Sequence, residues 1–168
     1  MSGDIQSGLH GLVAFRLGGL AFAVPVEAVA EVVPIARLGR PPHMPAAVEG
    51  ILNLAGRAVP VLRLDRLLGL ADGRYGLNAS ILVMRGSRPV GLLVEHVDAV
   101  VNAGDLQVLP VAAAESFNGC VIAELAHGAG VRHLLSWDHL LLEEERRRLG
   151  EFAAREQERL AESWGAQP

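Results

Sequence analysis

The sequence predicts a mainly β protein that ends in one long helix. Short apolar stretches recur between Gly, Pro, Asp and Asn residues, which is typical of sandwiches and small barrels. Helical periodicity is scarce before Asp138 and is then sustained from Leu140 to Trp164. The 168 residues suit one domain, and with 51% hydrophobic but only 4% aromatic residues its core must consist of Leu, Val, Ile and Ala.

The fold is predicted to begin with an antiparallel hairpin. Apolar segments at 12–17 and 20–26 flank the pair Gly18-Gly19, which suits a tight turn. Pro25 then occupies a position typical of a first helical residue, and three valines that follow share one helical face. We therefore expect one short turn of helix within 25–33.

The run 48–62 is the most informative part of the chain. Gly50 and Gly56 bracket an apolar stretch, and glycine allows strands to bend or another backbone to approach closely. Asn53 lies inside a strand that looks buried, so we expect its side chain to satisfy backbone groups at a turn. Pro60 predicts that the second strand of this run is an edge strand or carries a bulge.

Three segments follow before the tail. Leucines within 62–70 lie at helical spacing, and Gly69 is placed to end a short helix there. The segment 71–76 contains two glycines and is the best candidate for an internal hinge. The apolar segment 90–97 is expected to form a strand.

The tail carries the one long helical pattern. Glu143 and Glu144 precede Arg147 and Arg148 by one helical turn, and each such pair is worth about 0.2 to 0.5 kcal/mol. A sparse apolar stripe accompanies them, consisting of Leu142, Leu149, Phe152, Leu160 and Trp164. Either the helix is partly docked and partly solvated, or it presents an additional partner surface. Residues 165–168 are expected to be disordered.

The composition excludes several functions. A net charge of −4 and few aromatic residues disfavour a nucleic-acid-binding barrel, which needs a basic stripe and stacking platforms. All fifteen basic residues are arginines. A lysine-poor genome explains this bias more simply than a need for guanidinium groups that bind partner carboxylates through two hydrogen bonds. The single Cys120 indicates a reducing compartment. Neither a secretion signal in residues 1–8 nor a membrane-spanning run is visible, so we expect a cytoplasmic protein without direct membrane insertion.

No motif for catalysis is present. The chain lacks a nucleophile elbow, a phosphate-binding loop and a zinc-protease motif, so we predict no catalytic, cofactor-binding or metal-binding residues. His133 and His139 lack the partners expected around a metal. Isolated acidic residues such as Asp65 are expected at solvated positions. The rival class is a small ligand-binding or enzymatic barrel with a pocket lined by Gly91, Glu95 and His96.

The order of these pieces resembles the CheW family of bacterial chemotaxis coupling proteins. The resemblance runs from about Leu9 to Leu142, and no single piece is specific, whereas the series is. The segments that carry it are 12–26, 29–33, 41–45, 48–62, 66–70, 90–97 and 134–141.

The resemblance implies a CheW-like domain of two small five-stranded SH3-like β-barrels over residues 9–142. Residues 1–8 would be a disordered tail, and 143–168 a C-terminal helix and tail. The implied function is a non-enzymatic adaptor in bacterial signal transduction. It would bridge the cytoplasmic signalling tip of a chemoreceptor to the regulatory domain of a CheA-type histidine kinase, at membrane-bound receptor arrays.

The resemblance also implies site residues. The receptor-binding positions of the family match Val29, Glu31, Gly50, Asn53 and Gly56, and Val97 is the one position assigned to kinase binding.

Two departures from the family pattern concern partner binding. Ala55 replaces an arginine that the family commonly uses toward the receptor, and Arg57 would place its charge about 6 to 7 Å away on a strand. Arg63 and Asp65 stand where the family usually has aspartate and then arginine. The alternative is therefore a member of a specialised pathway, for surface behaviour or second-messenger control, with altered or lost receptor binding.

Overall fold

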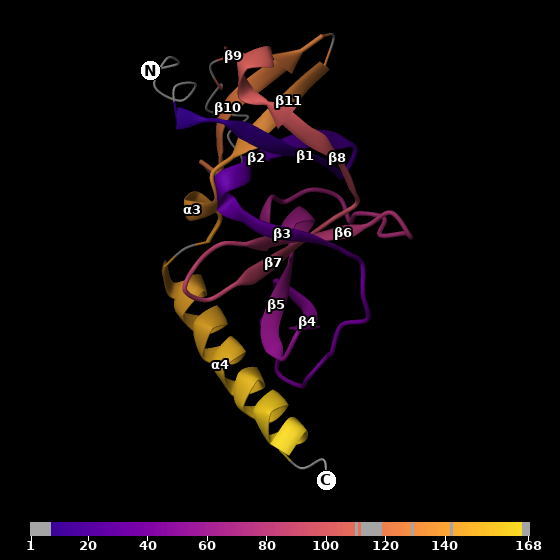
Figure 1. Cartoon of the computed structure of the whole chain (residues 1–168), viewed down its shortest axis with the longest axis vertical. Helices are drawn as coiled ribbons and strands as arrows, with labels where there is room; N and C mark the ends of the chain where they lie inside the picture. The colour runs from indigo at the N-terminus through magenta and orange to yellow at the C-terminus, as the bar shows by residue number, and fades with distance from the viewer. Residues whose placement is uncertain (1–7, 110, 112–118, 129, 142, 166–168) are drawn as a thin grey trace.

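The structure is a computed structural model that describes residues 8–109, 111, 119–128, 130–141 and 143–165. It contains two β-sheets and a long C-terminal helix, so the mainly β prediction is confirmed (Figure 1). The first sheet has six strands in the order β8-β1-β2-β11-β10-β9, rather than the five that the resemblance implies. The second sheet has five strands in the order β3-β6-β7-β5-β4.

The first sheet combines strands from both ends of the chain. Its members are β1 (Gly11–Leu17), β2 (Leu20–Pro25), β8 (His96–Asn102), β9 (Gln107–Leu109), β10 (Val121–His127) and β11 (Gly130–Leu135). A 3-10 turn, η2 (Ala103–Asp105), joins β8 to β9. The predicted hairpin is confirmed: β1 and β2 pair antiparallel around Gly18 and Gly19, which have φ values of +58° and +78°.

The second sheet comes from the middle of the chain. Its members are β3 (Val29–Pro34), β4 (Val48–Leu54), β5 (Arg57–Arg63), β6 (Ser80–Met84) and β7 (Val90–Val94). The short turn of helix expected within 25–33 is confirmed as the 3-10 turn η1 (Val26–Ala28), after which β3 pairs with β6. The valines that follow continue as a strand because β-branched residues suit a strand once a partner strand is available.

Two strand predictions were wrong. The segment 90–97 is not one strand, because the chain leaves the second sheet at Val94 and enters the first at His96. Pro60 does not lie on an edge strand, since β5 pairs with β4 on one side and β7 on the other, and the register shift in the β4–β5 ladder lies on β4, between Val48 and Gly50. The proline is tolerated because the ladder to β7 begins only at Val61, so no partner there needs an N–H from Pro60.

The segment 71–76 is not a hinge between the sheets. It joins α2 (Leu64–Leu67), which directly follows β5, to β6, and β5 and β6 both belong to the second sheet. The segment is also tied down, since the Gly73 amide donates a 2.8 Å hydrogen bond to Asp65 Oδ2. The predicted helix stop is confirmed, because Gly69 follows α2 with a φ of +69°.

One hydrophobic cluster spans both sheets. Phe15 and Phe22 of the first sheet stack with ring centroids 5.8 Å apart, and the same cluster includes Leu82 and Leu92 of the second sheet. Each sheet also has a smaller buried cluster of its own.

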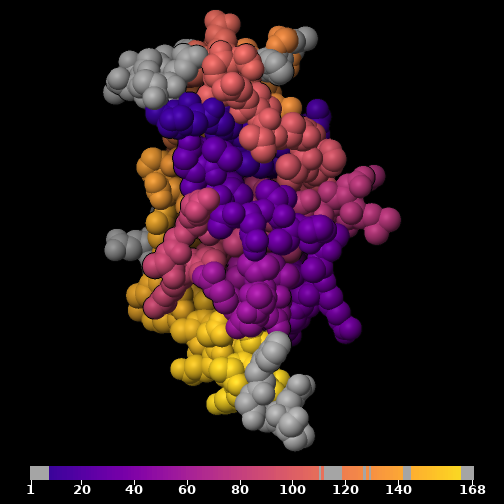
Figure 2. Space-filling model, in the orientation of Figure 1, coloured from indigo at the N-terminus to yellow at the C-terminus, as the bar shows by residue number. Residues whose placement is uncertain are grey.

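The C-terminal helix adds to the cluster that spans both sheets. After the short helix α3 (Trp137–Leu140), α4 (Glu143–Gly165) runs along the second sheet, and its surface abuts that sheet (Figures 1 and 2). Leu149 and Phe152 are buried whereas most of the other described side chains of α4 are exposed, as the partly docked interpretation predicts. Arg147 pairs with Glu151 at 3.6 Å. The predicted pairs of Glu143 and Glu144 and the positions of Leu142 and the Trp164 side chain lie outside the described residues.

The hairpin between β4 and β5 turns through Ala55 and Gly56, whose φ values are +50° and +86°. Positive φ at both central residues defines a type I′ turn, in which alanine is disfavoured. We predict that Ala55→Asn raises the free energy of unfolding by about 0.5 to 1 kcal/mol, because asparagine tolerates this conformation. Ala55→Val should lower it, and urea denaturation measures both. Equal stability of all three proteins would contradict the turn assignment.

Candidate functional site

The predicted receptor-binding residues divide into exposed and buried positions. Glu31 is exposed in the middle of β3, and Asn53 is exposed at the end of β4, where its Oδ1 accepts a 2.9 Å hydrogen bond from the Gly56 amide. The expected turn role of Asn53 is confirmed, although its strand position is not buried. Val29, which is only 6% exposed, and Gly50 instead face the interior.

The segment that follows β3 connects the two edges of the second sheet on which the predicted receptor-binding residues lie. β3 and β4 are opposite edges of the second sheet, but Gly39 and Ile51 exchange two backbone hydrogen bonds of 2.8 Å. Gly50 makes this approach possible, since a Cβ there would lie 2.7 Å from both the Gly39 carbonyl oxygen and Leu38 Cβ. The close backbone approach predicted for Gly50 is confirmed.

Exposed aliphatic side chains follow Glu31 along β3 and the segment after it. Val32 and Ile35 are 43% and 36% exposed, and Val32, as the strand neighbour of Glu31, points to the opposite face of β3. Beside them lies an open groove of about 720 Å³ lined by Ile35, Arg37, Leu38, Arg40, Glu49, Tyr75 and Leu93. Sequence reasoning did not single out Val32 and Ile35, because an aliphatic residue in an apolar segment carries no signal of its own exposure.

A buried ion pair supports one wall of this groove. Arg63 donates to Asp65 from Nε at 2.9 Å and from Nη2 at 2.6 Å, and Asp65 is 0% exposed. The Arg63 guanidinium lies 4.9 Å from the ring centre of Tyr75 and 3.4 Å from Glu49 Oε2, both groove residues. The solvated position expected for Asp65 was wrong. The charge swap preserves a local pair, because the two side chains contact each other.

The electrostatics of this pair favour full ionisation. Burial by itself raises the pKa of Asp65, but hydrogen bonds from Arg63 and from the Gly73 amide outweigh it and hold the pKa well below its usual range. The hydrogen bonds to Asp65 likewise raise the pKa of Arg63. Burial raises the pKa of the neighbouring Tyr75 phenol. Asp65 therefore stays charged at neutral pH in a dry environment.

Val97 lies on the other sheet. It belongs to the edge strand β8, where it pairs with Phe15 of β1 and packs partly against the core. Val100 on the same strand is 67% exposed. Asp98, between them, accepts hydrogen bonds from Arg16 at 3.3 Å and Arg132 at 3.0 Å, which fixes β8 against β1 and β11.

The helix α4 is fastened to the β4–β5 hairpin by Gln157. Its Oε1 accepts a 2.8 Å hydrogen bond from the Ala58 amide, and its Nε2 donates to the Gly56 carbonyl at 3.0 Å. At this end of β5 the ladder to β7 has not begun, so the Gln157 amide occupies the position of a neighbouring strand. Apart from the helical pattern of the tail, nothing in the sequence predicts this contact.

We predict that Gln157→Leu lowers the free energy of unfolding by about 1 to 3 kcal/mol, because it leaves the Ala58 amide without its partner. Chemical denaturation measures the difference. Glu158→Gln, on the exposed neighbouring position of α4, is the matched control and should change stability by less than about 0.5 kcal/mol. Amide hydrogen exchange at Ala58 should accelerate only in the Gln157 variant. Unchanged exchange at Ala58 in that variant would contradict the role of Gln157 in fastening α4 to the β4–β5 hairpin.

The rival pocket is not assembled. Glu95 and His96 border an open groove of about 450 Å³, but Glu95 Oε1 is engaged by the Gly18 amide at 2.8 Å. Gly91 lies in the interior strand β7 against Ile81 and Val61 and does not line that groove. Within the described ranges, no three His, Cys, Asp or Glu side chains are grouped to hold a metal ion. Cys120 is buried, and burial raises the pKa of its thiol.

None of the helices in the described part of the chain has both the length and the apolar composition needed to cross a bilayer.

Comparison with known proteins identifies the family. The model of the CheW-like domain matches residues 11–141. The chemotaxis protein CheW of Rhizobium meliloti (strain 1021) is 33% identical over 107 residues, 63% of this chain and 69% of the relative. Protein FrzA of Myxococcus xanthus is 32% identical over 115 residues, 65% of this chain and 72% of the relative.

A solved structure has the same fold. The scaffolding protein TtCheW from Thermoanaerobacter tengcongensis superposes with a TM-score of 0.69 at 20% sequence identity, over 80% of this chain and 88% of that chain. The family match stops at Leu141, so α4 lies beyond it. The mainly β fold, the motif series and the family model agree, and the chain belongs to the CheW-like domain family.

Proposed function

We propose that this protein is a non-enzymatic adaptor that couples chemoreceptors to a CheA-type histidine kinase. The observation that carries the proposal is the separation of two exposed surfaces. The surface around Glu31 lies on the second sheet, and the surface around Val97 lies on the edge of the first. Two partners can therefore bind the adaptor at the same time without competing.

The surface around Glu31 suits the helical signalling tip of a receptor. Ile35 offers apolar contact and Arg37 offers positive charge at the rim of the groove, where Arg40 is paired with Glu49 at 2.7 Å. Glu31 and Asn53 would contact the receptor directly, and the Gly50 and Gly56 backbones would hold the hairpin in place. Such a site binds modestly, and assembly into receptor arrays at the cytoplasmic face of the membrane would multiply that affinity.

The experiment is a pair of pull-downs, one with the regulatory domain of a CheA-type kinase and one with a receptor signalling tip. Glu31→Arg should weaken receptor binding by about tenfold or more and spare the kinase. Val97→Glu should do the reverse. Asp105→Arg, an exposed charge reversal on η2, is the matched control. If either variant keeps its fold but loses binding to both the kinase and the receptor, this would contradict separate binding surfaces for the two partners.

The second candidate function is kinase binding with altered receptor coupling. It is favoured by Ala55, whose side chain at the hairpin tip is a methyl group where the family commonly has arginine. Arg57 begins β5 opposite Leu54 and does not share the turn. If Ala55→Arg restores receptor binding that the natural chain lacks, this candidate is supported. Receptor binding by the natural chain that Ala55→Arg does not strengthen would exclude it.

A further inference from the structure

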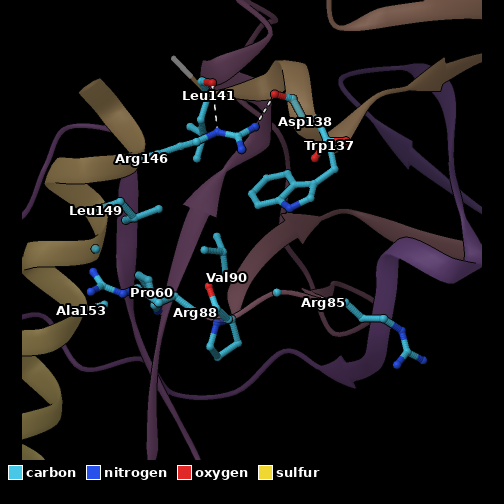
Figure 3. Close-up of a pocket in the computed structure, with 14 residues that line it drawn as sticks. Pro60, Arg85, Arg88, Val90, Trp137, Asp138, Leu141, Arg146, Leu149 and Ala153 are labelled. Atoms are coloured by element: carbon cyan, nitrogen blue, oxygen red, sulfur yellow. Dashed lines mark hydrogen bonds between the residues drawn. The ribbon is translucent and has the colours of Figure 1, made fainter. Parts of the chain in front are cut away.

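A cavity of about 330 Å³ lies between the β6–β7 loop at 85–89 and the start of the C-terminal helix (Figure 3). It is separate from the groove beside Glu31 and from β8. Its second wall comes from α3 and α4, and α4 lies outside the region that matches the family. None of the proposed partner-binding residues lines it.

Part of the lining of this cavity is apolar, and Asp138 is the one acidic residue among the residues that line it. Val90 lies at its floor, Leu149 of α4 closes one side, and the indole of Trp137 stands opposite (Figure 3). Val90 and Leu149 are largely buried in the protein, whereas Trp137 is only partly covered. The size is at the lower end of small-molecule sites, which admits a compact body of one or two rings.

A guanidinium group projects over these walls. Arg146 donates from Nε to the Leu141 carbonyl at 3.3 Å and from Nη2 to the Asp138 carbonyl (Figure 3). Both acceptors are neutral, so these hydrogen bonds orient the guanidinium above Trp137 without neutralising its charge.

A second guanidinium reaches the same cavity from the loop. Arg88 crosses to α4, where its guanidinium fills the space that a Cβ at Gly150 would need. Among the described side chains, neither Arg88 nor Arg146 forms an ion pair with a carboxylate. Arg85 also borders the cavity, but its side chain extends away from it (Figure 3).

We propose that this cavity binds a small organic anion, consisting of an aromatic or compact apolar body and a carboxylate or phosphate group. The body would lie between Trp137, Val90 and Leu149, and a planar ring would stack on the indole. The anionic group would bind Arg146 and Arg88, whose guanidinium forks match carboxylate and phosphate oxygens. A bound anion would link the β6–β7 loop to α4.

The test follows the fluorescence of Trp137 in a Trp164→Phe background, where Trp137 is the one remaining tryptophan. Phenyl phosphate and phenylacetate are the two probes, and benzyl alcohol is the uncharged control. At least one anion should quench the emission saturably, with at least tenfold tighter binding than benzyl alcohol. The anion that binds more tightly distinguishes a phosphate ligand from a carboxylate ligand.

Variants of the arginines complete the test. Arg88→Gln and Arg146→Gln should each weaken binding of the preferred anion about tenfold, whereas Arg85→Gln should leave it unchanged. Thermal melting checks folding, and Arg88 lies on an exposed loop, so its variant remains informative if Arg146→Gln unfolds the protein. Absence of saturable quenching by both anions, equal binding of benzyl alcohol, or equal loss in the Arg85 variant would overturn the proposal. Partner pull-downs are independent of each of these results.

Discussion

Replacing Asp65 with alanine is expected to lower the free energy of unfolding by about 3 to 5 kcal/mol, because it leaves the buried Arg63 guanidinium without its charge partner. The Gly73 amide loses its acceptor at the same time. Urea or guanidinium denaturation followed by circular dichroism gives the difference. If the variant cannot be purified folded, Asp65→Asn retains the volume and provides a measurable intermediate.

The double variant Arg63→Met, Asp65→Leu separates the stability that the ion pair contributes from the cost of leaving one buried charge without its partner. With both charges removed, no ion remains buried without a partner, and apolar replacements of similar volume often restore or raise stability. We expect the double variant to be more stable than Asp65→Ala. Asp72→Ala is the matched control, because this carboxylate is exposed and lies 3.4 Å from Arg63. A loss as large in Asp72→Ala as in Asp65→Ala would contradict the special role of the buried pair.

The same pair predicts how stability depends on pH. The pKa of Asp65 is lowered on folding, so its contribution is complete above the unfolded pKa of about 3.9 and is lost as pH falls toward the folded value. The natural protein should therefore lose stability progressively from about pH 5 to pH 2. Asp65→Ala should show a shallower decline over that range when unfolding is measured at several pH values. Parallel curves for the two proteins would contradict the direction of the shift.

Gly50→Ala is expected to lower the free energy of unfolding by about 1 to 3 kcal/mol, and Gly50→Asp by more, since a buried charge adds to the overpacking. The added Cβ would lie 2.7 Å from the Gly39 carbonyl and from Leu38 Cβ. The obstacle includes backbone, so a rotamer change cannot relieve it. The bridge between Gly39 and Ile51 should open, and the segment after β3 should detach from β4.

This result would separate two explanations for lost receptor binding. A Gly50 variant that fails to bind a receptor would do so because the groove beside Tyr75 and Leu38 is deformed. Glu31→Arg, by contrast, should abolish binding while leaving the denaturation midpoint within experimental error. Gly76→Ala is the matched glycine control, because no atom lies within 4 Å of the position its Cβ would take. Equal stability of the Gly50 and Gly76 variants would contradict the structural role of Gly50.

The elements that could be predicted are those fixed by local chemistry. The β1–β2 hairpin and the end of α2 at Gly69 follow from residues that tolerate positive φ. The segment 29–33 could not be assigned in the same way, because valines at 26, 29 and 33 fit a helical face and a strand equally well. Pairing of β3 with β6, which lies far along the chain, decides between them.

The candidate site was predictable to a similar extent. Matching motifs located Glu31 and Asn53 on exposed positions and Gly56 on a half-buried turn position, but they also pointed to Val29 and Gly50, which face inward. The burial of Asp65 depends on Tyr75 and Gly73, which cover it from a loop with no regular pattern. The cavity beside Trp137 depends on where α4 docks, and periodicity gives the apolar face of a helix without giving its partner.

The parallel pairing of β2 with β11 places Phe22 beside His133 and has a consequence during synthesis. All strands of the second sheet have been translated once Val94 has emerged, whereas β1 and β2 must wait for β8 and β11. On the ribosome the N-terminal hairpin therefore presents unpaired edges while all strands of the sheet that follows it are already available to pair. The risk of aggregation in a nascent chain falls on β1 and β2, which in the finished protein are interior strands.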